Sequence, residues 1–290
     1  MKAAAARSGT TPRMTDADAS RFGAHAPSGL LSRLLPITQS GAPTWTGRRR
    51  AHLLRAVGLR ALGGRPADVA RLGARMRLHP QDNLCEKRLL FTPQWFDPAE
   101  LAYLAGRVTP GFAFVDLGAN VGAYSLFVAA RAGDDSRIVA VEPQPALYGR
   151  LVYNMRVNRF AAIRARRCAV ADRDGNVAMC IDERNKGASS IRPAQTGPEI
   201  RVAARPLAAL VADEGLDRID AMKLDLEGAE DLALTPFFRD APERLWPRAL
   251  LLEWSPRRWG TDLHAKLTRL GYAETLRTRR NVAFERGARA

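Results

Sequence analysis

The segment Val115–Gly122 reads VDLGANVG, an apolar run that passes directly into a turn with two glycines. Residues 112–117 are apolar except for Asp116, which is typical of a strand buried on both faces of a parallel sheet. Gly118 and Gly122 have no side chain where a ligand would approach the backbone, and the free amides at a helix start favour an anionic group. The segment therefore predicts a strand, a ligand-binding turn and a helix in succession.

The turn departs from the G-x-G-x-x-G pattern of dinucleotide-binding folds. Asn120 occupies the position of the second glycine, and Asp116 precedes the first. An acidic side chain at that place would repel a pyrophosphate, whereas it suits a ligand that carries an ammonium or sulfonium group. The turn alone thus disfavours NAD as the ligand.

Strand signals alternate with helix signals from Gly111 to the end of the chain. The expected strands are residues 112–117, 137–141, a segment that ends near 170, 219–224 and 250–252, with an antiparallel pair at 272–276 and 282–284. The expected helices are residues 121–131, a helix with its buried face at 148–155, 206–211 and 261–270 (Thr261 as N-cap), and an extra hairpin is expected after Asp174-Gly175. This alternation predicts a doubly wound α/β sheet, and such sheets bind ligands at the carboxyl ends of their strands.

Two of the predicted strands are followed by a single carboxylate. Glu142 ends the second strand, where a carboxylate can accept both hydroxyls of a ribose. Hydrogen bonds to a charged group contribute about 1.5 to 3 kcal/mol each. Asp172 follows the third strand and could accept an adenine amino hydrogen, but a surface turn residue explains it equally well. Glu142 therefore predicts a nucleoside in the ligand, whereas Asp172 leaves both interpretations open.

Several charged residues gather at the end of the fourth strand. Strand alternation places Lys223 and Asp225 on one face, and Glu227 and Glu230 follow closely. Burying such charges is costly unless they serve a site or pair with one another. Glu230 is interpreted as a residue that favours the next helix start through the helix dipole, and Glu253 ends the fifth strand. Acids at this many strand ends predict a binding or catalytic site.

The first part of the chain has a different composition. Residues 1–44 are rich in Ala, Ser, Thr, Gly and Pro and are expected to form a flexible tail. Residues 45–110 show helical periodicity with an arginine run at 48–50, and they are expected to form a basic helical cap ahead of a domain at 111–290. Residues 1–110 carry 17 basic and 7 acidic side chains, so much of the net charge of +15 lies outside the predicted domain. The arginine run is interpreted as a solvated face rather than a binding arm.

The overall composition is that of a globular chain. Of its 290 residues 46% are hydrophobic, and no apolar run reaches the roughly 18 residues that a membrane span needs. Asp16 and Asp18 argue against a transit peptide, and the alanine run near the start is too short for a signal peptide, so a cytoplasmic location is expected. Cys85, Cys168 and Cys180 match neither a zinc cluster nor an even disulfide framework, and the four histidines are far apart. No metal site is therefore predicted.

Taken together, these motifs resemble the FkbM family of S-adenosylmethionine-dependent methyltransferases over residues 71 to 284. The segments that carry the resemblance are 114–126, 141–143 and 219–230, with Asn154, Asn158, 187–190 and 251–253 in support. The resemblance implies a Rossmann-like, seven-stranded methyltransferase sheet in which the terminal hairpin supplies the last two strands. It also implies O-methylation of a hydroxyl on a sugar, polyketide or other small metabolite. The pair Trp254-Ser255, which follows Glu253, departs mildly from the commonest pattern of this family.

Under this resemblance the cofactor is S-adenosylmethionine, and the candidate residues acquire roles. The cofactor-binding set is Asp116, Gly118, Asn120 and Gly122 for the methionyl end, Glu142 for the ribose and Asp172 for the adenine. Asp225 or Glu227 would take the acceptor's proton, while Lys223 would orient a carboxylate or stabilise the developing alkoxide. A divalent metal between Asp225 and Glu253 is not expected, because no third ligand is evident. The expected partner is a small-molecule hydroxyl acceptor.

Other classes of function stay open. The basic first segment fits an RNA-binding protein or an RNA methyltransferase, although it lacks the interleaved aromatic residues of a single-strand platform. A nicotinamide oxidoreductase would use the same sheet class, but Asp116 and Asn120 disfavour it. A catalytically silent scaffold would show the same pattern. Titration with S-adenosylhomocysteine against NAD would separate a methyltransferase from a nicotinamide oxidoreductase.

Overall fold

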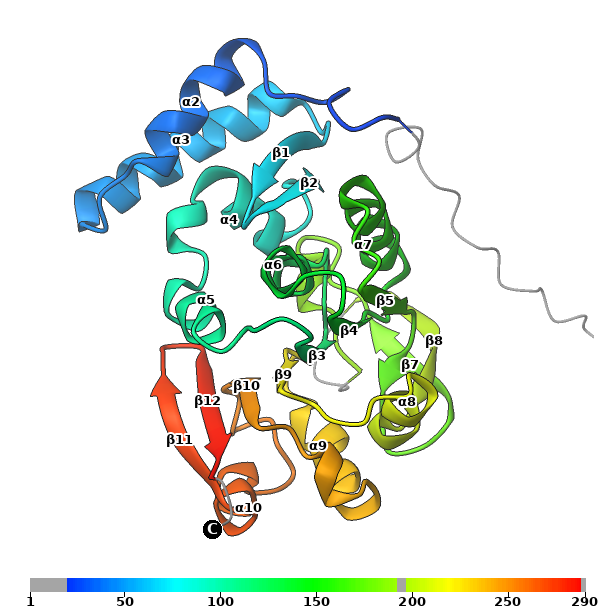
Figure 1. Cartoon of the computed structure of the whole chain (residues 1–290). Helices are drawn as coiled ribbons and strands as arrows, with labels where there is room; N and C mark the ends of the chain where they lie inside the picture. The colour runs from blue at the N-terminus through cyan, green and yellow to red at the C-terminus, as the bar shows by residue number, and fades with distance from the viewer. Residues whose placement is uncertain (1–19, 192–196, 288–290) are drawn as a thin grey trace, which may run out of the picture.

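The computed structural model describes residues 20–191 and 197–287 (Figure 1). Residues 1–19 of the predicted tail lie outside this range. The helices are α2 Gly29–Gln39, α3 Trp45–Leu62, α4 Leu84–Phe91, α5 Pro98–Ala105, α6 Ala123–Ala132, α7 Pro145–Asn158, α8 Leu207–Asp213, α9 Glu230–Asp240 and α10 Leu263–Arg269. The strands are β1 Ala67–Arg71, β2 Ala74–Leu78, β3 Ala113–Leu117, β4 Arg137–Val141, β5 Ile163–Arg166, β6 Ala169–Val170, β7 Gly175–Cys180, β8 Glu199–Arg205, β9 Ala221–Leu224, β10 Ala249–Glu253, β11 Tyr272–Arg277 and β12 Asn281–Arg286.

The main sheet has seven strands in the order β11-β12-β10-β9-β3-β4-β5. The strands from β10 to β5 are parallel, whereas β12 is antiparallel to both β10 and β11. The chain order reverses beside β3, so that β3 lies between β9 and β4. This arrangement confirms the predicted Rossmann-like, seven-stranded sheet, including the terminal hairpin.

Strand β3 is buried on both faces, as its apolar sequence predicts. All five of its residues are buried. Phe114 packs into one hydrophobic cluster, while Val115 and Leu117 pack into the other. Helices α6 and α7 contribute to the first cluster, and α8, α9 and α10 contribute to the second. The sheet is therefore a central layer with helices on both sides.

The N-terminal part is more structured than the sequence predicts. Helix α2 lies inside the predicted tail and begins at residue 29, because Leu31, Leu34 and Leu35 form a buried face at helical spacing despite the flanking Gly and Pro residues. The predicted helical cap also contains a two-stranded sheet, β1–β2. Helix α3 approaches α4 so closely that a Cβ at Gly58 would lie 2.5 Å from the Phe91 ring. In Figure 1, α2 and α3 lie together at one end of the molecule.

The two asparagines that support the family resemblance connect β2 to α7. Asn154 accepts a 2.8 Å hydrogen bond from the amide of Arg77 and donates to the carbonyl of Val121 at 3.1 Å. Asn158 accepts a 2.8 Å bond from the amide of Arg75. These side chains therefore link the N-terminal hairpin to α7 and to the turn after β3.

The prediction of a single third strand is wrong, because the structure divides this segment between the main sheet and a separate three-stranded sheet. The segment that was expected to end near residue 170 is divided into β5 in the main sheet and β6 in a small sheet with order β6-β8-β7. The expected hairpin strand β7 pairs with β8, which the sequence analysis did not predict. Helix α10 also begins differently, because Asp262 rather than Thr261 is its N-cap and accepts from the amide of Ala265. Within the described segments, no helix combines the length and hydrophobicity that crossing a bilayer requires.

Candidate active site

Two cavities adjoin where β3, β4 and β9 end. Including the solvent space at its mouth, the first has a volume of about 600 Å³ and the second of about 760 Å³. Their shared lining residues are Gly118, Asn120, Gly187, Asp225 and Glu227. The turn after β3 and the end of β9 therefore form the boundary between two compartments, as expected for a ligand site at a topological switch point.

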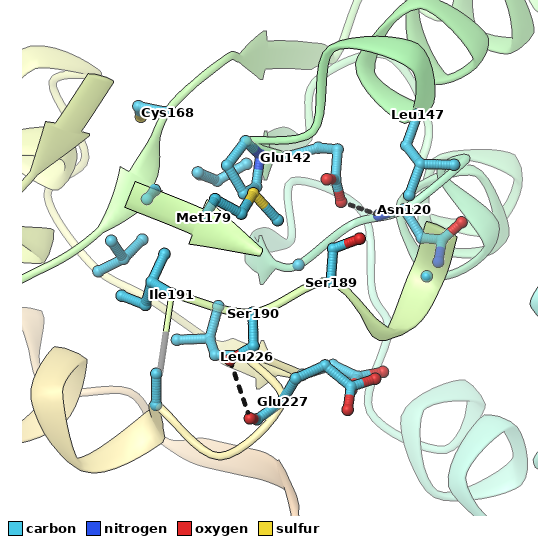
Figure 2. A pocket seen from close by; sticks show the side chains of 18 of the residues that line it. Asn120, Glu142, Leu147, Cys168, Met179, Ser189, Ser190, Ile191, Leu226 and Glu227 are labelled. Carbon is cyan, nitrogen blue, oxygen red and sulfur yellow. Dashed lines mark hydrogen bonds between the residues drawn. The ribbon is translucent and has the colours of Figure 1, made fainter. Parts of the chain in front are cut away.

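The first cavity combines an apolar surface with several acidic groups, among them Glu142 and Glu227 (Figure 2). Its apolar surface comes from Leu147, Cys168, Met179, Ile191 and Leu226. Polar groups of the lining include those of Glu142, Asn120, Ser189 and Ser190. An apolar cavity with a few placed polar groups is the usual form of a small-molecule site.

Glu142 is one of the carboxylates that line the first cavity, and two backbone amides hold it. Its Oε2 accepts from the amide of Asn120 at 2.9 Å, and its Oε1 accepts from the amide of Gln144 at 2.9 Å. The side chain is only 5% exposed, and burial raises the pKa of its carboxyl to about 7 despite these two bonds. Each oxygen retains a second lone pair, so the carboxylate can still accept two hydroxyl hydrogens.

The glycine turn is shaped by the approach of β9. Gly118 has φ +75°, and a Cβ there would lie 2.0 Å from the carbonyl oxygen of Asp225. Asn120 also has a positive φ, +55°, and its Oδ1 accepts from Nδ2 of Asn83 at 2.7 Å. Only glycine fits at the first position without displacing the end of β9.

Asp116 is buried beside the second cavity, and one of its two carboxylate oxygens accepts hydrogen bonds. Its Oδ2 accepts from the amide and from the hydroxyl of Ser125, at 3.1 and 2.6 Å. Among the described residues, Oδ1 has no hydrogen-bond partner although it is buried. Burial also raises the pKa of this carboxyl above its ordinary value. A buried acceptor without a partner is costly, so Oδ1 marks a place for a donor group.

Lys223 and Asp225 form a close ion pair at the wall of the second cavity. The Lys223 Nζ lies 3.0 Å from Asp225 Oδ2 and 4.8 Å from the centroid of the Tyr124 ring. Burial lowers the pKa of Lys223, but the charges of Asp225 and Asp116 outweigh burial and raise it above the ordinary value. Lys223 is therefore a permanent cation that fixes one oxygen of Asp225.

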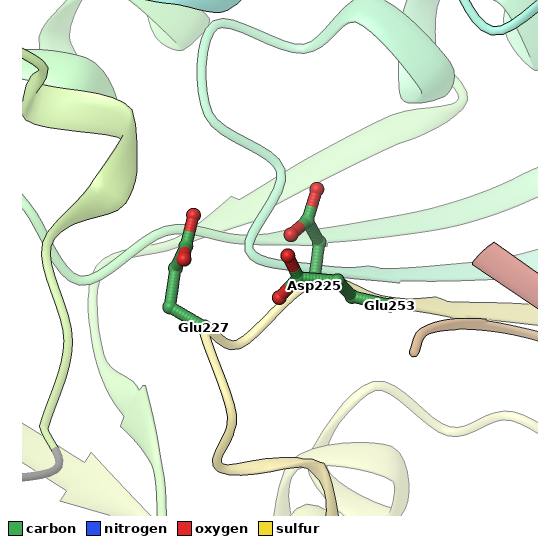
Figure 3. Close-up of side chains that lie close together, drawn as sticks. All are labelled: Asp225, Glu227 and Glu253. Atoms are coloured by element: carbon green, nitrogen blue, oxygen red, sulfur yellow. The ribbon is translucent and has the colours of Figure 1, made fainter. Parts of the chain in front are cut away.

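Asp225, Glu227 and Glu253 come together from two neighbouring strand ends (Figure 3). Each offers one oxygen, and these oxygens lie within 4.8 Å of one another. Burial and the charge of Asp225 raise the pKa of Glu227 to about 8 and that of Glu253 to about 7. Arg258 lies 3.6 Å from Glu227 and partly offsets this effect. Glu227 thus supplies the third carboxylate that the sequence analysis lacked, while the expectation of no metal stays a prediction.

Asp172, like Gly122, is a predicted cofactor residue that the structure does not bring to these cavities. It is exposed between β6 and β7 and lines neither cavity. Its proposed contact with adenine stays a prediction that no described contact supports. Gly122 lies just before α6, where a Cβ would lie 2.7 Å from Leu151, so the turn packs closely against α7, and the predicted contact of Gly122 with the cofactor stays a prediction. The other predicted residues meet at the two cavities.

Glu230 has a local structural role, as the sequence analysis proposed. It begins α9 and accepts from the amides of Leu226 and Gly228, at 2.9 and 3.2 Å. It also accepts a 2.7 Å bond from the indole of Trp259. These contacts fix the loop that carries Glu227.

Sequence reasoning missed most of the far wall of the second cavity. That wall consists of Asn83, Leu84, Cys85, Arg88, Phe96 and Asp97 from the N-terminal part, Tyr124 from α6, and Arg280 and Asn281 from the terminal hairpin. Tyr124 donates to Asp97 at 3.0 Å, and Arg88 donates to the same carboxylate at 2.9 Å. Asn83 could have been found as a helix N-cap, but no local motif connects segments so distant in the chain.

The FkbM methyltransferase domain matches residues 116–272, which is more than half of the chain. The chain belongs to the FkbM methyltransferase family. Two curated relatives of this FkbM chain are Methyltransferase sdnD of Sordaria araneosa, 27% identical over 173 residues, and Methyltransferase 1 of Beauveria bassiana, 25% identical over 136 residues. The alignments span 49% and 40% of the FkbM chain, and 63% and 54% of the relatives' own lengths.

Solved structures with similarity to the FkbM chain are also methyltransferases by their descriptions. The methyltransferase domain of METTL16 aligns with a TM-score of 0.45 at 14% identity, covering 89% of this chain and 91% of that one. An S-adenosylmethionine-dependent O-methyltransferase of Thermotoga maritima aligns with a TM-score of 0.39 at 12% identity, covering 67% and 66%.

Proposed function

We propose that this FkbM protein binds S-adenosylmethionine across the two cavities and methylates a hydroxyl of a small molecule held in the second. The observation that carries the proposal is the position of Glu142. Its buried carboxylate forms the wall of an apolar cavity, directly bonded to the glycine turn after β3. A carboxylate at the end of the strand beside the first βα turn is suited to bind the hydroxyls of a ribose.

The residues around Glu142 fit the rest of this cofactor. Asp116 Oδ1, buried without a partner in the described structure, suits the ammonium of the methionyl group. Gly118 lines both cavities, so the backbone of the turn borders the space for the ligand. Met179, Ile191 and Leu226 offer apolar surface to a planar base. We therefore assign the nucleoside to the first cavity and the methionyl end to the boundary between the two.

Methyl transfer makes modest chemical demands on the protein. When bound, S-adenosylmethionine supplies an electrophilic methyl group on its sulfonium. The protein must hold the acceptor oxygen in line with that methyl, and orientation of this kind can contribute about 7 to 11 kcal/mol to lowering the barrier. The walls of the second cavity, which come from the N-terminal part and the terminal hairpin, would position the acceptor.

The acceptor's proton would pass to a carboxylate at the end of β9. Asp225 is held at Oδ2 by Lys223, which leaves Oδ1 as the acceptor atom. Glu227 is the second candidate, because a carboxyl with a pKa near 8 is close to the ideal for a general base near neutral pH. Lys223 would also stabilise negative charge on the acceptor oxygen.

A thermal-shift measurement tests the cofactor half of the proposal. S-adenosylhomocysteine should raise the melting temperature of the full chain, because a ligand that binds only the folded state stabilises it, and NAD should not. A shift with NAD alone would replace the proposal with a nicotinamide oxidoreductase.

A panel of candidate acceptors tests the other half of the proposal, which is methylation of a small-molecule hydroxyl. Release of S-adenosylhomocysteine from S-adenosylmethionine should depend on a sugar, polyketide or other hydroxylated small molecule. Turnover with RNA alone would favour an RNA methyltransferase and contradict the assignment of the second cavity to a small molecule.

A further inference from the structure

Helices α2 and α3 expose an unusual amount of apolar surface. Six large hydrophobic side chains are exposed in the described part of the chain, and five of them lie on these two helices. They are Leu30 (53%), Ile37 (40%), Trp45 (71%), Leu53 (64%) and Val57 (40%). The sixth, Leu232, lies on α9. The α2–α3 pair lies outside the FkbM match at residues 116–272, so the family gives it no role.

The same two helices carry only positive charge. Residues 29–62 contain six arginines and neither Asp nor Glu. Arg49 places its guanidinium 5.3 Å from the centroid of the Trp45 ring. Cationic and apolar groups are thus adjacent on one element.

On α3 these groups form one stripe. Trp45, Arg49, Leu53 and Val57 follow at intervals of four residues, and Arg60 lies three residues beyond the last. At 100° per residue they occupy a sector of about 120°. The buried residues Ala51, Gly58 and Leu62 lie on the opposite side, against the rest of the molecule. We call Trp45, Arg49, Leu53, Val57 and Arg60 the α3 stripe.

We propose that the α3 stripe binds the surface of an anionic lipid bilayer. Helices that lie in the bilayer interface combine Trp and Leu, which enter the boundary between headgroups and acyl chains, with Arg, which binds lipid phosphates. The stripe has both kinds of group and no acid that would repel the surface. A nucleic acid would use the arginines but gain little from Leu53 and Val57. This interaction is independent of the proposed methyl-transfer chemistry.

Vesicle flotation of the full chain tests the proposal. The chain should float with vesicles of phosphatidylcholine and phosphatidylglycerol, and much less with phosphatidylcholine alone. The substitutions Arg49→Gln and Arg60→Gln together should weaken binding about 25-fold, because each basic residue near an anionic surface contributes about a factor of five. Leu53→Ser alone should weaken it about tenfold. Thermal unfolding of each variant should match the wild type, since all three side chains are exposed.

Matched controls come from exposed residues elsewhere on the molecule. Leu232→Ser removes the one exposed large hydrophobic side chain that the described residues carry outside α2 and α3, and Arg173→Gln with Arg201→Gln removes two exposed charges near the small sheet. All of these should leave vesicle binding unchanged.

Three outcomes would overturn the proposal. One is failure of the wild-type chain to float with anionic vesicles. Another is equal loss of binding with the control variants, which would indicate non-specific attraction of a basic protein. The third is binding to RNA that falls with the Arg49 and Arg60 changes while Leu53→Ser has no effect on either RNA or vesicles, which would assign the surface to nucleic acid.

Discussion

Glu142 accepts a 2.9 Å hydrogen bond from the backbone amide of Asn120, so the end of β4 is bonded directly to the turn that follows β3. The two motifs that suggested a nucleoside ligand are therefore one structural unit. The same turn approaches β9, because Gly118 stands against the carbonyl of Asp225. Changes in the turn should consequently affect both cofactor binding and the position of the candidate base.

Gly118→Ala should disrupt the site and destabilise the fold. The new Cβ would lie 2.0 Å from the Asp225 carbonyl oxygen, a backbone atom that cannot rotate away, and the positive φ adds strain. We expect a loss of about 2 to 4 kcal/mol in the free energy of unfolding, measured by urea denaturation. Gly149→Ala is the matched control, because no atom lies within 4 Å of its Cβ position in α7. It should be neutral or stabilising, and equal effects of the two changes would contradict the geometry described.

Asp225→Asn should reduce turnover while leaving cofactor affinity nearly intact. The amide keeps an oxygen for Lys223 but cannot take a proton from the acceptor, so a loss of roughly 10²- to 10⁴-fold in kcat is expected. The measurement is a rate with any acceptor found in the panel, beside a binding titration. Full activity of Asp225→Asn would exclude it as the base and assign that role to Glu227.

Glu227 should make folding stability depend on pH. Its pKa in the folded protein is about 8 against an ordinary value of 4.5, because burial and the charge of Asp225 disfavour the anion. Between these values the folded state binds more protons than the unfolded state, so the stabilising contribution is lost as pH rises through the folded pKa. Glu227→Gln should therefore raise the free energy of unfolding by on the order of 2 kcal/mol at about pH 9, and by little at about pH 5. A gain that is the same at both pH values would refute this account of Glu227.

Removal of divalent metal should leave the protein unaffected. Asp225, Glu227 and Glu253 could together hold an ion, but Lys223 and Arg258 already place positive charge beside two of them. We expect the same melting temperature and the same binding of S-adenosylhomocysteine with a chelator as with added Mg²⁺. A rise in melting temperature on adding Mg²⁺ that disappears in Glu253→Gln would show that the carboxylates form a metal site.

The sequence was most informative where one strand end carries its own signal. Local sequence patterns were enough to identify three parts of the site: the run at residues 112–117 with its glycine turn, Glu142 after β4, and Lys223 with Asp225 at β9. The parallel sheet brings these three parts to one edge. The doubly wound α/β sheet could likewise be predicted, because buried strands and amphipathic helices have different periods, whereas its seven strands were implied by the family resemblance.

The missed features depend on contacts between distant segments. Helix α2 gains its stability by burying three leucines against neighbouring helices, which its Gly- and Pro-containing sequence does not reveal. The far wall of the second cavity joins Asn83 and Asp97 to Asn281 across almost two hundred residues, with no shared motif. Asp172 follows β6, which belongs to the small sheet, and it is exposed, so the local pattern left both interpretations of it open and its contact with adenine stays a prediction.

Calorimetric titration of wild-type protein and Glu142→Gln with S-adenosylhomocysteine tests the central claim most directly. The wild type should bind one equivalent, more weakly below about pH 7, because protonation of Glu142 removes a hydrogen-bond acceptor. Glu142→Gln should weaken binding roughly ten- to hundredfold and abolish that pH dependence, while Asp135→Asn, a control at an exposed carboxylate that lines neither cavity, should bind like the wild type. Absence of heat with folded wild-type protein, or unchanged affinity in Glu142→Gln, would contradict the assignment of this carboxylate to an adenosyl ligand.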